Sequence, residues 1–314
     1  MSTGGEAGGD RTLNEIGVKE FHDALAKSSD VAVAVAAIKA LTAVIRSSGA
    51  QTIMGLTKEL QDAAAALQRV NPTALNLRAG CELFLRYTSR TALEFSEFSS
   101  AKTRLIERGN TFAETSARAR STIAEQGARF LTPNCVVLLH GYSRVVLALL
   151  SRAVAQGTNF SVIVTEGRPD STGLSMARVL HDLGIPTTLI LDSGVAYAME
   201  KADMVLVGAE AVVENGGVVN KLGTYQIALC AKACSRPFYV AAESYKFARL
   251  YPLTQKDLPT ERKPCDLGPL VPPRTTIDNP SRDYTPPSLI SLLVTDLGVL
   301  TPAAVSDELI QLYL

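Results

Sequence analysis

The chain has 314 residues, of which 46% are hydrophobic and 20% are charged. This composition is typical of a folded globular protein and excludes an intrinsically disordered one. Its 31 basic and 31 acidic side chains leave no net charge, whereas proteins that bind nucleic acid normally carry a basic excess that displaces counterions from phosphates. We therefore expect no direct nucleic-acid partner.

The cysteines and the N-terminus indicate a cytosolic protein. Five cysteines, an odd number dispersed along the chain, do not form a disulfide framework and favour a reducing compartment. The first residues, MSTGGEAGGD, lack the basic and then apolar pattern of a signal peptide, so residues 1–12 are predicted to be a disordered leader. No apolar stretch approaches the roughly 20 residues of a membrane span, and no membrane partner is expected.

The first part of the chain, residues 13–129, is predicted to be a helical domain. Alanine, leucine and arginine recur there at three- and four-residue spacing, which is the period of a helix face. The predicted helices run near 13–27, 31–47, 52–70, 73–95 and 98–128.

The second part, residues 130–314, is predicted to be an α/β domain with a mainly parallel sheet. Short apolar runs at 135–140, 160–166, 187–192, 204–210 and 237–243 alternate with helical segments, among them 143–155, 171–183 and 224–234. Continuous apolar strands joined by helices indicate a parallel sheet covered on both faces.

The C-terminal part begins with a proline-rich stretch. Nine of the fifteen prolines lie between Pro252 and Pro287, which predicts a long extended connection in residues 252–287. Residues 288–301 are predicted to be buried, and Thr301-Pro302 to open a final helix.

Polar and flexible residues follow several of the predicted strands. The candidates for a binding site are Gly141, Tyr142, Ser143, Arg144, Arg168, Glu210, Asn220 and Lys221. Ligands bind beyond the carboxyl ends of parallel strands, and helix N-termini with arginine or lysine favour phosphate or another small anion. A set of turns and helix caps with solvated charges is the alternative.

Other kinds of site have weaker support. The three histidines lie in three different elements, so no metal site is expected, and the sequence contains neither common phosphate-binding glycine loop. The segment from Gly141 to Val145 is similar to a nucleophile elbow without its closing glycine. A hydrolase acting through Ser143 and a Ser143 that only caps the following helix both remain open, the cap being favoured.

Several blocks carry a family resemblance: HGYSRVVLALL, FSVIVTEGRPDSTG, MVLVGAEAVVENGGVVNKLGTYQIALCAKA, RPFYVAAESYKF and YTPPSLISLLVTDLGVLTPAAVSDEL. They closely resemble the alpha, beta and delta subunit family of translation initiation factor 2B, and its alpha members most. The order and spacing of VGAE, ENGG and NKLGTY make the resemblance specific, whereas the stretch from Pro259 to Pro280 departs from it. The resemblance implies a helical N-terminal domain followed by a Rossmann-like domain.

The wider family includes sugar-phosphate isomerases of the methylthioribose-1-phosphate and ribose-1,5-bisphosphate types, which use a cysteine after the first strand and an aspartate after the fourth. The matching positions here are Gly141 and Glu210. Glycine has no acid or base to offer, and the longer glutamate displaces its carboxylate. The resemblance therefore implies no catalytic residue and no cofactor, with an active sugar-phosphate isomerase of the methylthioribose-1-phosphate type as the alternative. Because Arg168, Asn220 and Lys221 remain, it also implies a sugar-phosphate or anion pocket.

What the resemblance implies for function is a regulatory subunit of the guanine nucleotide exchange factor for initiation factor 2. The expected partners are a second copy of the chain, the beta and delta subunits, and the phosphorylated alpha subunit of initiation factor 2. Arg104 and Arg108 share one face of the fifth helix and are candidates for contact with the phosphorylated partner. Pairing of these arginines with nearby glutamates on the helix surface is the alternative.

Overall fold

The computed structural model describes residues 12–27, 31–95, 97–258, 261–263, 265, 271–272 and 274–313. The predicted leader, residues 1–12, lies outside the described residues except for Thr12. The chain divides into two compact units, residues 1–113 and 114–314. The division falls within one long helix, α5 (Phe98–Ala128). It does not fall at residue 129, where the helical pattern of the sequence gives way to short apolar runs.

The first unit is helical, as predicted. Its helices are α1 (Leu13–Lys27), α2 (Val33–Ser47), α3 (Ile53–Val70), α4 (Leu75–Glu94) and the amino-terminal half of α5. Helix α2 is the central one, since it packs against both α1 and α4 and is buried on almost every turn. Close packing needs small residues, and a Cβ at Gly80 of α4 would lie 2.9 Å from the Ala34 Cα of α2.

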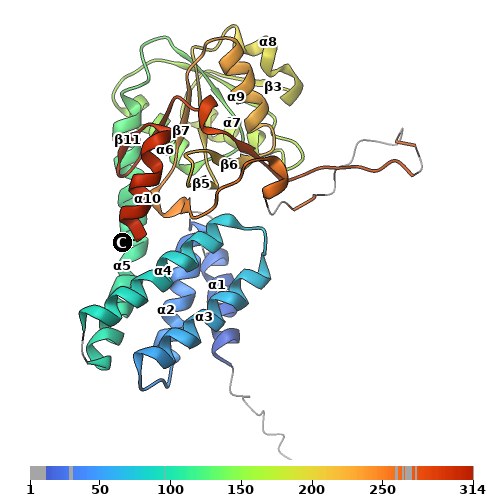
Figure 1. Ribbon diagram of the computed structural model, residues 1–314. Helices are drawn as coiled ribbons and strands as arrows, with labels where there is room; N and C mark the ends of the chain where they lie inside the picture. Colours follow the sequence, from blue (N-terminus) through green and yellow to red (C-terminus); the bar gives the residue numbers. More distant parts are fainter. Residues whose placement is uncertain are drawn as a thin grey trace, which may run out of the picture. The chain divides into compact units, whose positions relative to one another are not determined.

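The second unit contains a seven-stranded sheet, which confirms the predicted α/β class (Figure 1). Its strands are β1 (Val136–Leu139), β2 (Ser161–Thr165), β3 (Thr187–Ile190), β4 (Met204–Gly208), β7 (Phe238–Ala241), β10 (Leu292–Thr295) and β11 (Gly298–Leu300). They lie in the order β11-β10-β7-β4-β1-β2-β3. Every neighbouring pair is parallel except β10 and β11.

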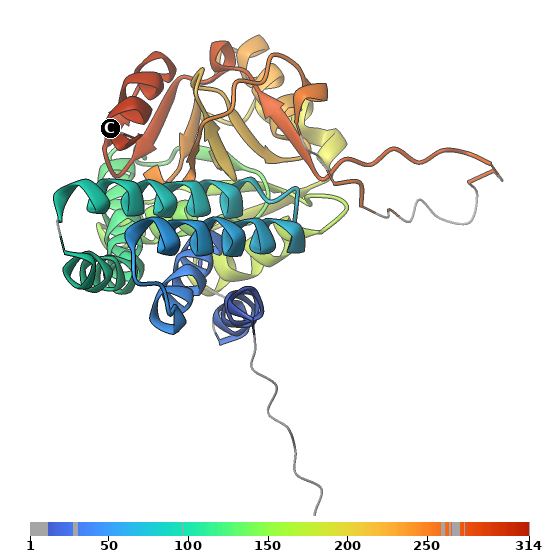
Figure 2. The ribbon, with the colours of Figure 1, turned by 60° about the horizontal axis from the view of Figure 1, so that its bottom comes forward.

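Helices cover both faces of this sheet, as expected for continuous apolar strands. They are α6 (Arg144–Ala155), α7 (Thr172–Asp182), α8 (Val195–Met199), α9 (Thr224–Ala233) and α10 (Val305–Tyr313). One core joins the sheet to the end of α5, to α6 and to α7, and a second core joins it to α8, α9 and α10 (Figure 2). Short 3-10 turns occupy Asp192–Gly194, Ser244–Lys246, Gln255–Asp257, Pro287–Leu289 and Pro302–Ala304.

A second sheet of four strands was not predicted. It contains β8 (Phe247–Ala248), β5 (Ala211–Val213), β6 (Val218–Lys221) and β9 (Arg282–Thr285), in the order β8-β5-β6-β9. Strand β9 lies within residues 252–287, so the end of this stretch is not an extended connection but a strand, whose last three residues are buried. Its sequence, RDYT, lacks the apolar alternation that marks a strand, and only pairing with β6 shows it.

No helix in the described parts of the chain is both long enough and apolar enough to cross a membrane.

Candidate functional site

The candidate site lies where the connections of the sheet change direction. From β1 the chain continues to β2 on one side, while β4 pairs with β1 on the other side. The loops at the carboxyl ends of β1 and β4 therefore diverge, and ligands of open α/β sheets bind in such crevices. The candidate residues lie at or near this edge of the sheet. They follow β1, β2 and β4 or belong to β6.

Gly141 follows β1 in a left-handed conformation, with φ +68°, which favours glycine. A Cβ built there would lie 3.7 Å from Cγ of Lys221 and 3.4 Å from Oγ1 of Thr172. The structure thus brings Gly141 and Lys221 together, although they are far apart in sequence.

Ser143 caps helix α6. Its Oγ accepts a hydrogen bond from the Val146 N–H at 3.5 Å, and it lies so close to Gly208, at the end of β4, that a Cβ at Gly208 would overlap it. Tyr142 is exposed beside it, and Arg144 is the first residue of α6. The arrangement favours the cap over a catalytic nucleophile.

His140 offers no base to Ser143 because both of its ring nitrogens have other partners. Nε2 lies 2.8 Å from the carbonyl oxygen of Leu222, and Nδ1 lies 2.6 Å from Oγ1 of Thr165. A carbonyl only accepts, so Nε2 carries the proton and Nδ1 accepts from the Thr165 hydroxyl. The side chain is buried and ties β1 and β2 to the loop before α9.

Replacing His140 is expected to destabilise the fold. In His140→Leu the Leu222 carbonyl and the Thr165 hydroxyl lose their partner, which costs about 2 kcal/mol of unfolding free energy. Burial lowers the pKa of His140 in the folded chain below its usual value of 6.5. The contribution of neutral His140 to the unfolding free energy is therefore present above pH 6.5 and is lost as the pH falls below that value. Urea denaturation at pH 8 and pH 5 measures both effects. His181→Ala, at an exposed site on α7, should change stability by less than about 0.5 kcal/mol, and equal losses in the two variants would contradict this role.

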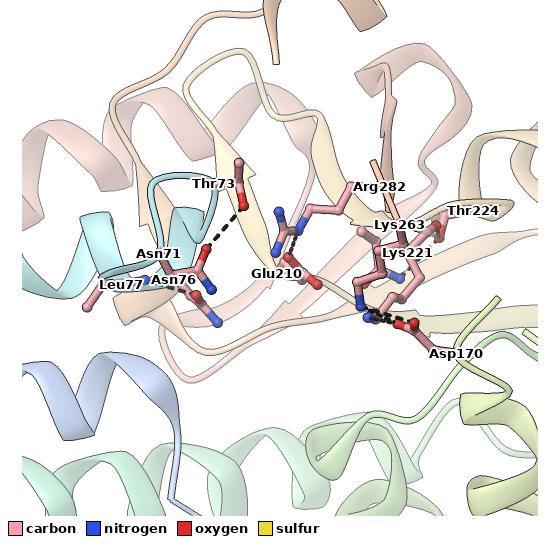
Figure 3. Close-up of polar contacts among 11 residues, drawn as sticks. Asn71, Thr73, Asn76, Leu77, Asp170, Glu210, Lys221, Thr224, Lys263 and Arg282 are labelled. Carbon is pink, nitrogen blue, oxygen red and sulfur yellow. Dashed lines mark hydrogen bonds and ion pairs between the residues drawn. The ribbon is translucent and has the colours of Figure 1, made fainter. Parts of the chain in front are cut away.

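Glu210, which the resemblance matches to the isomerase aspartate, is held by an ion pair. Its Oε2 accepts from Nε of Arg282 on β9 (Figure 3). Both side chains are mostly buried, with 19% and 11% exposed. The Glu210 carboxylate is thus paired with a guanidinium group. This pairing disfavours a role for Glu210 as a free base in proton transfer.

Cys135, the cysteine nearest to Gly141 in the sequence, is not placed to supply a thiol at this edge of the sheet. Cys135 immediately precedes β1 and is buried at the amino end of the strand. Glu210 follows the carboxyl end of β4, which runs parallel to β1. The two residues therefore lie at opposite edges of the sheet.

Lys221 forms an ion pair that was not predicted. Its Nζ lies 2.8 Å from Oδ2 of Asp170, and Nζ of Lys263 lies 2.9 Å from the same oxygen (Figure 3). Burial raises the pKa of Asp170, but the hydrogen bonds and charges of the two ammonium groups outweigh it and hold the pKa below its usual value. Asn220 is buried and donates from Nδ2 to Oγ1 of Thr224 at 3.1 Å, so it holds the turn into α9.

Arg168 lies in a tight loop after β2. The backbone N–H groups of Gly167 and Arg168 donate to the carboxylate of Asp192 at 2.9 and 2.7 Å. The guanidinium of Arg168 lies 3.4 Å from Glu166 and its side chain is 61% exposed. Arg168 is therefore accessible to a ligand from solvent.

A cavity of about 990 Å³ lies beside the first turns of α9. Among the residues that line it are Arg168, Gly223, Tyr225, Arg282 and Asp283. Asp283 is buried, and its Oδ2 accepts from the N–H groups of Gly223 and Tyr225 at 2.7 and 3.0 Å. Asp283, Arg282 and Lys263 were not predicted as site residues, because all three lie in residues 252–287, which the prolines predict to be an extended connection.

Arg104 and Arg108 both have partners within the helical unit. Arg104 lies 3.2 Å from Glu107, and Arg108 lies 3.5 Å from Glu94 and 5.8 Å from the ring centroid of Tyr87. The pairing with glutamates is the alternative considered above, while contact with a phosphorylated partner stays a prediction. In the described parts of the chain, no three His, Cys, Asp or Glu side chains cluster in a way that could hold a metal ion.

Comparison with known proteins identifies one matching family and several similar proteins. The profile of the "Initiation factor 2 subunit family" matches residues 26–302. A Dictyostelium discoideum protein named translation initiation factor eIF2B subunit alpha is 47% identical, over 94% of this chain and 96% of its own length. A ribose 1,5-bisphosphate isomerase of Pyrococcus furiosus is 33% identical, over 95% and 93% of the two chains.

Solved structures have the same fold. A chain of the tetrameric eIF2B-beta2-delta2 complex from C. thermophilum superimposes with a TM-score of 0.78 at 21% identity, covering 97% of this chain and 96% of that one. The profile match, the close relative and the arrangement of a helical unit followed by a mainly parallel sheet confirm the resemblance seen in the sequence. The chain belongs to the initiation factor 2 subunit family.

Proposed function

We propose that this chain is a non-catalytic, regulatory subunit of translation initiation factor 2B, the guanine nucleotide exchange factor for initiation factor 2, and acts in the cytosol. The observation that carries the proposal is the pair of changes at the isomerase positions. Gly141 has no side chain, and the carboxylate of Glu210 is bound to Arg282. Proton transfer between adjacent carbons needs two positioned acid or base groups.

The proposed assembly is a homodimer that joins two pairs of beta and delta subunits. The Dictyostelium relative named as the alpha subunit supports the choice of complex. The shared fold with a chain of the beta2-delta2 complex is consistent with related subunits that assemble together. Within this assembly, Arg104 and Arg108 of α5 are the proposed contacts for the phosphorylated alpha subunit of initiation factor 2.

The edge of the sheet around Gly141, Arg168 and Lys221 is the proposed pocket for a sugar phosphate. Its support is the closeness of Gly141 to Lys221 and the exposed guanidinium of Arg168. The ligand would regulate the subunit and would not be turned over.

An active sugar-phosphate isomerase is the second candidate, favoured by the 33% identity to the Pyrococcus furiosus enzyme. Turnover of ribose 1,5-bisphosphate by the purified chain distinguishes the two candidates. We expect no isomerisation above the uncatalysed rate.

Copurification tests the proposed assembly. The tagged full-length chain is expressed together with the beta and delta subunits of the same organism and isolated through its tag. We expect both subunits to copurify and the complex to be larger than the one formed by beta and delta alone, as measured by analytical ultracentrifugation. Recovery of the chain without either subunit would contradict the proposal.

A further inference from the structure

Two ammonium groups share one carboxylate at the edge of the proposed pocket. Lys221 Nζ bonds Oδ2 of Asp170, and Lys263 Nζ bonds both Oδ1 and Oδ2, at 3.0 and 2.9 Å. Two positive charges therefore face one negative charge, which leaves an excess charge of about +1 in this cluster. Because both ammonium groups reach the same oxygen, they lie close enough together for one phosphate group to accept from both.

Both lysines keep hydrogen-bonding capacity for a ligand. An ammonium group has three N–H donors, of which Lys221 uses one and Lys263 two on Asp170. Their side chains are 31% and 30% exposed, and that of Asp170 is 25% exposed. A ligand can reach these donors from solvent without unfolding the loop.

Lys263 is held in place by a short paired segment, residues 261–263 and 279–281, which we call the arm base. The Lys263 N–H donates to the Asn279 carbonyl at 3.0 Å, and the Asn279 amide donates back to the Lys263 carbonyl at 3.0 Å. The Ser281 N–H donates to the Glu261 carbonyl at 2.8 Å. Figures 1 and 2 show the neighbouring residues 274–278 running outward from the α/β unit.

The arm base is joined directly to the strand pair that carries Lys221. It continues into β9, which pairs with β6 so that Arg282 lies opposite Lys221. The small sheet therefore positions Lys221, and the arm base that leads into β9 positions Lys263, against the carboxylate of Asp170 in the loop after β2. This is a built arrangement of three elements and not two surface lysines that meet by chance.

We propose that Lys263 is a second cation of the anion pocket, and that Lys221 and Lys263 together bind the phosphate group of a phosphate monoester. The inference rests on the sugar-phosphate pocket proposed above and adds a binding residue from the proline-rich stretch. A phosphate monoester carries a charge of about −1.5 to −2 at neutral pH and accepts hydrogen bonds on three oxygens, which suits the spare donors of two adjacent ammonium groups. Occupancy of the pocket is thereby coupled to the arm base.

Isothermal titration calorimetry of the full-length chain tests this assignment. The probes are ribose 1-phosphate, inorganic phosphate and unphosphorylated ribose, and the variants are Lys221→Ala, Lys263→Ala and the control Lys232→Ala, which removes an exposed lysine of α9. We expect about a tenfold weaker Kd for ribose 1-phosphate in each of the first two variants, no change in the control, and no binding of ribose. Tight binding of inorganic phosphate that depends on both lysines would also support the two-lysine site, with free phosphate as its ligand.

The outcomes separate the inference from the proposed function. If Lys221→Ala weakens binding and Lys263→Ala does not, Lys263 is not a ligand-binding residue, while the pocket itself stands. If the unaltered chain binds neither phosphate compound, both the pocket and the role of Lys263 are wrong, whereas the assembly is still judged by copurification. Thermal unfolding of each variant checks the fold, because partly exposed ion pairs contribute little to stability.

Discussion

Gly173→Ala is expected to lower the unfolding free energy by about 3 kcal/mol. Gly173 is the second residue of α7 and lies directly against the end of β2. A Cβ at this position would overlap the carbonyl oxygen of Thr165 and lie 2.9 Å from that of Glu166. Strand β2 is paired on both sides, with β1 and β3, so the backbone cannot yield and the helix must move.

Gly194→Ala is the matched control for this prediction. The nearest atom to a Cβ there is Cβ of Ile190 at 3.9 Å, and the backbone φ of −84° suits any residue. Its unfolding free energy should stay within about 0.5 kcal/mol of the unaltered chain. Urea denaturation followed by circular dichroism measures both variants, and a Gly173→Ala variant as stable as the control would show that α7 can move away freely.

Asp283→Asn is expected to remove a change in unfolding free energy on the order of 3 kcal/mol between about pH 5 and pH 8. Burial raises the pKa of Asp283 to about 7, although the N–H groups of Tyr225 and Gly223 lower it. Between its usual pKa of 3.8 and about 7, the folded chain holds a proton that the unfolded chain has lost. The contribution to stability is therefore greatest at low pH and declines as the pH rises through this window.

Denaturation at pH 5 and pH 8 tests the assignment, since asparagine has no proton to lose. The stability of the unaltered chain relative to Asp283→Asn should fall between these pH values. Asp283→Ala removes the acceptor for two N–H groups at the start of α9 and should be less stable than Asp283→Asn by about 1 to 3 kcal/mol at both. Asp278→Asn, at an exposed carboxylate paired with Arg262, is the control. An identical pH dependence in the unaltered chain and Asp283→Asn would mean that Asp283 does not titrate in this range.

Two of these groups converge on a single turn. Nε2 of His140 donates a hydrogen bond to the carbonyl oxygen of Leu222 and is therefore not available to a ligand. Oδ2 of Asp283 accepts a hydrogen bond from the N–H of the next residue, Gly223. Gly223 itself has a φ of +104°, and a Cβ there would lie 3.0 Å from Cε1 of His140. The turn that carries Lys221 into α9 is therefore fixed from both sides by buried polar groups. Damage to either group should disturb the proposed pocket.

The helices of the first unit and the main strands of the second could be predicted from the amino-acid sequence alone. In both, the apolar period is regular and local, so that Ala-rich α2 and the run VVLL of β1 are recognisable without knowledge of their neighbours. The resemblance blocks likewise determined the family, because they are contiguous in sequence. The polar residues after β1 and β2 were recognised as site candidates for the general reason that parallel strands end on one edge.

The pairing of these candidate residues became visible only in the folded chain. Strand β9 has a charged sequence, which becomes a buried strand through its hydrogen bonds to β6. This strand places Arg282 beside Glu210 and Asp283 at the start of α9. Lys263 meets Asp170 across 93 residues of chain. Such contacts depend on strand order and register, which are set by long-range packing and leave no period in the local sequence.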